Sequence, residues 1–166
     1  MKWQSNTTNL ITKVNKKPWM VRRLKYLGAK RCDLVDMYAK HVRCILELAA
    51  PAWQGAITKA ERLELERVQK YALHIILGEE YESYNQALII TGLQTLEIRR
   101  QNLCLKFAKR AELHSKHKRW FALNTSTVNT RQQKVKYKNV QYRHTRFRNS
   151  PISYLTNLLN SHYSKK

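Results

Sequence analysis

Carboxylates are the side chains best suited to bind a catalytic metal ion, and two groups of them stand close in sequence. Asp33 and Asp36 are the only aspartates, and Glu79, Glu80 and Glu82 flank a tyrosine. Converging carboxylates could hold Mg²⁺ for phosphoryl transfer. Asp33 and Asp36, however, fall in the first turn of a predicted helix, where they interact favourably with the helix dipole. The glutamates lack a neighbouring His or Asp at ligand spacing, so we interpret them as a solvated acidic turn.

Cysteine and histidine side chains could support nucleophilic or metal chemistry at two places. His41 and Cys44 lie three positions apart on one predicted helix, but a buried thiol beside a core histidine is the more common meaning of such a pair. Cys104, His114 and His117 supply three possible zinc ligands, whereas a structural site needs four, and their spacing matches no familiar finger. The three cysteines predict no disulfide framework. We therefore predict no catalytic residues, no metal site, no cofactor and no enzymatic activity from this chain alone.

Positive charge dominates the composition. The 166 residues include 32 Lys and Arg against 11 Asp and Glu, which gives a formal net charge of +21. All 11 acids and 21 of the basic residues lie in residues 1–116, whereas residues 117–166 contain 11 basic residues and no acid. Such a charge opposes compaction and attracts polyanions, which favours nucleic acid as the partner. An anionic membrane surface is the alternative partner for this composition alone.

The sequence shows no secretion signal and no membrane-spanning segment. Its first residues lack an apolar signal core, and its longest uncharged apolar runs are too short to cross a bilayer. Three cysteines without close pairing agree with a reducing compartment. We expect an intracellular protein, nuclear or cytoplasmic and not secreted, with no membrane partner.

The period of the apolar residues predicts an all-α fold. They recur every three or four positions, which is typical of helices with one buried face. The four long predicted helices cover residues 7–27, 32–49, 58–77 and 96–114. A shorter helix follows Ser83 and ends at Gly92. We expect a small bundle of about five helices that forms one domain over residues 7–116.

Several predicted helix ends carry a physical signal. Pro18 interrupts the first helix, so we expect either a kink there or a new helix that begins with Pro18. Pro51 is expected to end the second helix. Thr58 and Glu61 fit a capping box at the start of the third, and Gly78 is expected to end it.

The same pattern assigns the buried faces. In the second helix the inward positions include His41, Ile45 and Leu48, and in the last long helix they include Phe107. The basic residues of that last helix, Arg100 among them, are expected to face solvent.

Residues 117–149 break the helical pattern. Val and Tyr alternate with polar residues from 130 to 143, which could be a weak strand, but no obvious partner strand exists. We predict a largely extended or disordered basic tail. Ser150 and Pro151 then supply the cap and the first residue of a short amphipathic helix over residues 150–160, which could dock on the bundle.

Basic residues beside apolar stripes or aromatic rings are the candidate nucleic-acid ligands. Their cationic groups can contact phosphates while the helix buries its apolar face. In the tail, aromatic rings alternate with cations, a combination that holds single-stranded nucleic acid. No base-reading motif is present, so we expect non-specific binding. The candidates are Arg22, Arg23, Lys25, Lys30, Arg31, Arg99, Arg100, Lys106, Lys109, Arg110, Lys134, Lys136, Lys138, Arg143, Arg146 and Arg148.

Several blocks of the sequence follow one another in a recognisable order. They are Arg22-Arg23-Leu24-Lys25 before Gly28, Asp33-Leu34 and Tyr38, the Pro51–Trp53 corner, Leu65–Gly78, Gly92-Leu93 to Arg99-Arg100, Leu103–Ala108, and Ser150-Pro151-Ile152 with Tyr154-Leu155. This order resembles the region behind the polymerase palm in reverse transcriptases of non-LTR retrotransposons, jockey-like and related. The resemblance covers about Leu10 to Asn160. It implies a thumb-like helical region beside a template–primer duplex, with Arg22, Arg23 and Lys25 nearest the nucleic acid.

The palm's aromatic-x-Asp-Asp box does not occur in this sequence. We therefore expect a truncated fragment of an RNA-directed DNA polymerase that binds RNA, DNA or a hybrid duplex without sequence preference. A separate palm-containing polypeptide would have to supply any polymerase activity. The main alternative is a helical protein-interaction module or a non-functional pseudogene product, in which the charge serves solubility. A membrane-surface protein, based on the basic amphipathic helix at 18–27, is a third possibility.

Overall fold

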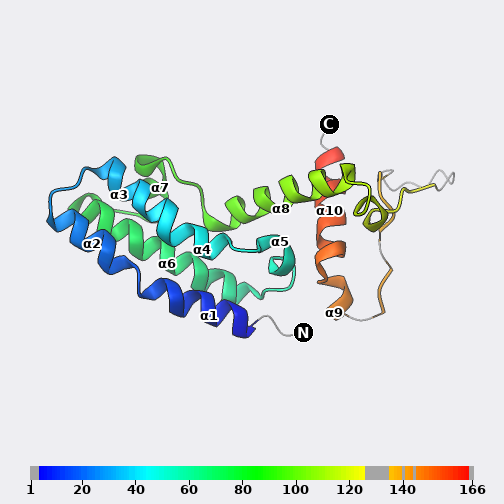
Figure 1. The fold of residues 1–166 in the computed structure, drawn as a ribbon, viewed down its shortest axis with the longest axis horizontal. Helices are drawn as coiled ribbons and strands as arrows, with labels where there is room; N and C mark the ends of the chain where they lie inside the picture. The colour runs from blue at the N-terminus through cyan, green and yellow to red at the C-terminus, as the bar shows by residue number, and fades with distance from the viewer. Residues whose placement is uncertain (1–3, 126–134, 140, 144, 165–166) are drawn as a thin grey trace. The chain divides into compact units, whose positions relative to one another are not determined.

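The computed structural model describes residues 4–125, 135–139, 141–143 and 145–164. Within these ranges the secondary structure is helical apart from one isolated β-bridge, which confirms the predicted all-α class (Figure 1). The chain divides into two compact units: residues 1–49 with 57–99, and residues 50–56 with 100–166. This division falls inside the range 7–116 that we expected to be one domain.

The first unit is organised around its longest helix, α6, which contacts α1, α2, α3 and α7. Figure 1 shows α6 running alongside α1 and α2. Leu65, Val68, Ala72 and Ile76 of α6 are buried at spacings of three and four, as a helix with one apolar face requires. The helices of this unit are α1 (Gln4–Asn15), α2 (Pro18–Tyr26), α3 (Arg31–Tyr38), η1 (Ala39–Arg43), α4 (Cys44–Glu47), α6 (Lys59–Leu77), η2 (Gly78–Glu80), α7 (Tyr84–Thr91) and the first residues of α8 (Leu96–Leu113).

Local capping signals place most of the helix ends. Pro18 is the first residue of α2, so the new helix forms rather than a kink in a continuous one. Both halves of the capping box between Thr58 and Glu61 are present at the start of α6. The Ser83 side chain caps α7, and Gly92 ends that helix in the left-handed conformation. These ends follow the sequence prediction because each depends on neighbouring residues only.

The second predicted helix contains a π-helical segment, η1, between α3 and α4. Its buried residues are Leu34, Tyr38, Val42 and Leu46, each four positions from the last. In a regular α-helix of 3.6 residues per turn, side chains four positions apart move gradually around the helix axis. A π turn contains more residues, so it rotates the chain less per residue and brings the buried side chains back to one face. His41 and Leu48, which were predicted to face inward, are exposed, and Leu46 is buried instead, so the predicted face was wrong at these three positions.

Pro51 does not end the second predicted helix. The helix ends earlier, at Glu47, and Ala49 adopts a positive φ of 51° that turns the chain. Pro51 lies in the first turn of the next short helix, α5 (Ala50–Trp53). Proline is well tolerated there because the first turn leaves its backbone N–H groups without helical partners.

The buried side chain of Gln69 links α6 by hydrogen bonds to α3, to α7 and to the loop before α8. Its Oε1 accepts a hydrogen bond from the Tyr38 hydroxyl at 2.7 Å, and its Nε2 donates to the Tyr84 hydroxyl and to the Gln94 carbonyl at 3.0 and 2.9 Å. Tyr84 donates in turn to Glu66, whose carboxylate also accepts from the backbone N–H of Leu96. Burial raises the pKa of Tyr38, and burial with the bond to Glu66 raises the pKa of Tyr84, so both phenols remain donors.

The second unit contains α5, most of α8, η3 (Lys118–Trp120), α9 (Thr145–Arg148) and α10 (Pro151–Tyr163). Ser150 caps α10 and Pro151 opens it, as predicted, but the helix continues three residues past 160. α10 packs on α5. Gly55, just after α5, makes this approach possible because a Cβ there would lie 2.6 Å from Cβ of Tyr154.

A short extended pairing occurs in the second unit. Leu123 and Tyr137 form an antiparallel bridge, with hydrogen bonds from Asn124 N–H to the Lys136 carbonyl and from Lys138 N–H to the Ala122 carbonyl. The expectation that nothing pairs with the 130–143 segment was therefore wrong for residues 135–139, while residues 126–134 lie outside the described ranges. The side chain of Asn160 continues the pairing, since it accepts from the N–H and donates to the carbonyl of Tyr137.

Replacing Gln69 with leucine is expected to lower the free energy of unfolding by about 2–4 kcal/mol, because it removes the partner of a buried phenol at nearly constant volume. Urea unfolding followed by far-UV circular dichroism measures the change. Gln86→Ala, on the exposed surface of α7, is the matched control and should change stability by less than about 0.5 kcal/mol. Equal stability of the two variants would show that the Gln69 bonds contribute nothing.

The substitution Gly55→Ala is expected to destabilise the second unit by about 1–3 kcal/mol, since the new methyl group meets Tyr154 at its Cβ, which cannot rotate away. Differential scanning calorimetry of the whole chain measures the loss. Asn157→Ala, at an exposed position of α10, is the control. An unchanged transition in Gly55→Ala would contradict the close approach of α5 and α10.

Candidate nucleic-acid interface

Two of the carboxylates considered as metal ligands, Asp36 and Glu80, form ion pairs on the surface. Asp36 lies 3.0 Å from the ammonium group of Lys40, and Glu80 accepts from the Arg31 guanidinium at 2.6 Å. Both pairs are solvent-exposed, as surface ion pairs commonly are. Among the described residues no group of three or more His, Cys, Asp and Glu side chains is placed to hold a metal ion.

The thiols differ in exposure. Cys44 and His41 are exposed, which corrects the expected buried pair, and the Cys44 thiol donates to the Lys40 carbonyl. Cys104 is buried, and burial raises the pKa of its thiol to about 12. A thiol that stays protonated at neutral pH is a weak nucleophile and a poor metal ligand. The rings of His114 and His117 stack on each other, with centroids 4.7 Å apart.

Basic side chains gather at the end of α1, in the turn that follows it and on α2. We call it the α1–α2 basic face and define it by Lys13, Lys16, Lys17, Arg22 and Arg23. Lys17 is half-buried and the other four side chains are exposed. The chain contains no Asp or Glu before position 33, so neither helix supplies a counter-charge. In the part of the chain that the structure describes, the ion pairs involve none of these five cations.

The sequence prediction included Arg22 and Arg23 but missed Lys13 of α1 and Lys16 and Lys17 in the turn after it. The sequence does carry a signal for these lysines, because no acid occurs in the first 32 residues. The prediction considered only basic residues beside apolar stripes or aromatic rings. Arg22 donates a hydrogen bond to the Tyr71 hydroxyl of α6, and the Arg23 guanidinium lies over the Tyr26 ring at 5.6 Å. These contacts orient both guanidinium groups without neutralising them.

The other candidates near α2 have partners within the first unit. The Lys25 ammonium group donates to the Ile75 carbonyl at the end of α6, at 2.8 Å. Arg31 pairs with Glu80, while Lys30 is exposed at the start of α3. Lys25 and Arg31 are thus less available to an external phosphate than the α1–α2 basic face is.

The basic residues of α8 do not all face solvent. Arg100 is fully buried, 0% exposed, and donates to the Gln54 side chain at 2.8 Å, with its guanidinium over the Trp53 ring. The expectation that Arg100 is available to nucleic acid was therefore wrong. Phe107, expected to be inward, is 39% exposed instead. Arg99 pairs with Glu47 at 3.1 Å, whereas Lys106 and Arg110 are exposed and Lys109 is half-buried.

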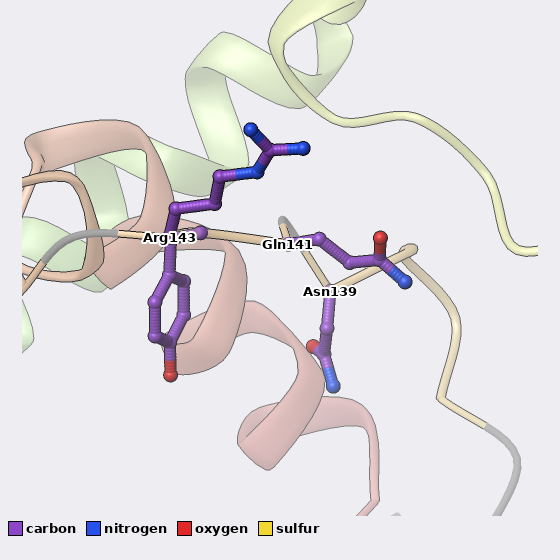
Figure 2. Close-up of a pocket in the computed structure, with 4 residues that line it drawn as sticks. Asn139, Gln141 and Arg143 are labelled. Carbon is purple, nitrogen blue, oxygen red and sulfur yellow. The ribbon is translucent and has the colours of Figure 1, made fainter.

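The tail residues form an open surface. Asn139, Gln141, Tyr142 and Arg143 line a hollow of about 680 Å³. Figure 2 shows that the labelled side chains fan out from the extended segment and do not converge on one point. The remaining candidates are distributed as follows: Lys138 is exposed, the Arg148 guanidinium lies over the Tyr142 ring, Arg146 belongs to α9, and Lys134 lies outside the described residues.

Lys136 serves the fold of the second unit. Its ammonium group lies 2.6 Å from Glu112, the only acidic residue in the segments 50–56 and 100–166, and 4.0 Å from the Tyr163 ring centroid. The hydroxyls of Tyr137 and Tyr163 also donate to Glu112. Burial opposes ionisation of Glu112, but the hydrogen bonds from Lys136 and the two tyrosines outweigh it and lower the pKa of Glu112. Hydrogen bonding to Glu112 raises the pKa of Lys136.

Comparisons of this chain with protein-family models, curated proteins and solved structures found no match. Within the described ranges, no helix is both long and apolar enough to cross a membrane. Function must therefore be inferred from the residues and their geometry, and the α1–α2 basic face is the strongest candidate site.

Replacing Glu112 with glutamine is expected to lower the free energy of unfolding by about 2 kcal/mol at pH 7, because it removes a carboxylate that accepts from a cation and two phenols. Since the pKa of Glu112 is lowered by folding, its contribution is present above the ordinary glutamate pKa of about 4.3 and is lost as the pH falls through the lower folded value. The gap between wild type and Glu112→Gln should thus close toward pH 3. Urea unfolding at pH 7, 5 and 3 measures it, and a gap that stays constant would rule out the ionised cluster.

Proposed function

We propose that this chain is a nucleic-acid-binding helical module, similar to the thumb-like region of a non-LTR retrotransposon reverse transcriptase. It binds RNA, DNA or a hybrid through phosphates, without sequence preference. The observation that carries this proposal is the α1–α2 basic face, five cations on the end of α1, on α2 and in the turn between them, with no carboxylate before position 33.

Charge placement favours a polyanionic partner over a role in solubility. Solubilising surfaces commonly mix cations with carboxylates, as the Lys40–Asp36 and Arg67–Glu64 pairs do in this unit. The α1–α2 basic face has a single sign, so its potential is positive over the whole surface and attracts phosphates. Release of condensed counterions then supplies the sequence-independent part of the affinity.

The rigid attachment of the two helices supports the same proposal. The aliphatic side of α2 is occupied by packing, because Val21 is buried and α2 contacts α6. The cations therefore project from a fixed scaffold, as a helix that lies along a nucleic-acid backbone requires. On this proposal the chain extends no primer by itself, and a palm-containing polypeptide would be its partner in polymerisation.

The salt dependence of binding tests the proposal. We expect a fluorescein-labelled 20-nucleotide RNA or DNA to bind with a log–log salt slope of about −4 to −7, as contact with roughly five to eight phosphates predicts. Fluorescence anisotropy between 50 and 300 mM NaCl measures the slope. An affinity that does not change over this range would exclude phosphate-driven binding.

A pair of charge-matched variants locates the site. Lys16→Gln with Arg23→Gln should reduce the magnitude of the slope by about 1.4–1.8, since two phosphate contacts are lost. Lys40→Gln with Arg67→Gln also removes two positive charges, but these two cations already form ion pairs with Asp36 and Glu64. This double variant should therefore leave the salt slope unchanged. Equal effects of the two double variants would assign the binding to net charge and not to the α1–α2 basic face.

A further inference from the structure

Two large aromatic rings lie exposed on the outer side of α2. Trp19 is 64% exposed and Tyr26 is 81% exposed. They are seven residues apart, so they project from the same side of the helix, about 10 Å from each other along its axis. Burial of rings of this size would stabilise the fold substantially, so their exposure costs the chain that stabilisation.

The rings border two hollows in the surface of the first unit. One, of about 330 Å³, is lined by Trp19, Arg22, Arg23 and Tyr26. The other, of about 560 Å³, is lined by Trp19 together with Lys13, Lys16 and Lys17, among others. Trp19 therefore stands between an aromatic–guanidinium hollow and a lysine hollow.

This combination fits a ligand that carries flat rings and anionic groups at regular spacing. A lipid surface fits poorly, because an interfacial helix needs a broad apolar face, and Val21 on the aliphatic side of α2 is already buried in the unit. Arg22 and Arg23 line the same hollow as the two exposed rings, so cationic side chains accompany the rings on this side of α2. Nucleic acid matches both features, since bases stack on aromatic rings and guanidinium planes while phosphates follow the cations.

We propose that this surface, the Trp19–Tyr26 platform, stacks unpaired bases of single-stranded nucleic acid, with the neighbouring phosphates held by Lys13, Lys16 and Lys17. Paired bases hide their faces inside the duplex, so only an unpaired strand can use the rings. At about 3.4 Å per stacked base, the span from Trp19 to Tyr26 covers about three nucleotides. This inference rests on the proposed function and adds to it a preference for strands with accessible bases.

Binding of oligothymidylate and of a duplex of equal length by the full chain tests the platform. The double variant Trp19→Ala with Tyr26→Ala should bind a 12-nucleotide oligothymidylate at least about tenfold more weakly, given the usual contribution of base–aromatic stacking. Duplex affinity should change less than about twofold. The salt slope for oligothymidylate should stay the same, because the phosphate contacts remain.

Two further variants separate stacking from general disruption. Trp19→Phe with Tyr26→Phe keeps both rings and should restore most of the single-strand affinity. Ile89→Ala removes an apolar side chain that is 82% exposed on α7 and should affect neither ligand. Far-UV circular dichroism should be the same for all variants, because each replaced side chain is exposed.

Each other outcome overturns a specific statement. If the alanine variant loses single-strand and duplex affinity equally, or loses neither, the platform is refuted while the proposed function stands. If wild type binds neither nucleic acid, the proposed function fails. If the variant keeps its oligothymidylate affinity but no longer binds vesicles containing phosphatidylserine that wild type binds, the rings serve a membrane surface and the inference is wrong.

Discussion

The scarcity of carboxylates constrains the whole structure. With 11 acids against 32 basic residues, few carboxylates are available to neutralise the cations that folding brings together. Glu47 forms ion pairs with both Arg43 and Arg99, Glu97 pairs with Arg62, and Glu112 is the one acid in the sequence of the second unit. Among the described residues, the five cations of the α1–α2 basic face form no ion pair with a carboxylate. The same imbalance thus accounts for both the anchoring of the fold and the exposed basic face.

Features that depend on neighbouring residues could be predicted from the sequence. The capping box of Thr58 and Glu61, the Ser83 cap and the proline starts at Pro18 and Pro151 each require only a few adjacent side chains. The helical class follows from the same local periodicity. These signals act before tertiary contacts form, so the pattern is sufficient to place them.

Features that depend on distant residues could not be predicted. Arg100 is buried because Gln54, 46 positions earlier, receives its hydrogen bond. Lys136 resembles a solvent-facing tail cation in the sequence, but Glu112 and Tyr163 meet it only in the folded chain. The α1–α2 basic face is different, because the absence of acids over the first 32 residues is a signal that the sequence itself contains.

The π-helical segment η1 affects which insertions and deletions the chain can tolerate during evolution. A π turn accommodates one more residue than an α turn, so it is the usual way for a helix to absorb a single-codon insertion. Leu34 and Tyr38 before the segment and Leu46 after it remain on one buried line despite the extra residue. Loss of one codon between Ala39 and Arg43 would convert the segment to a regular α-helix and keep that line intact. This stretch can therefore vary in length while the surrounding core residues stay in place.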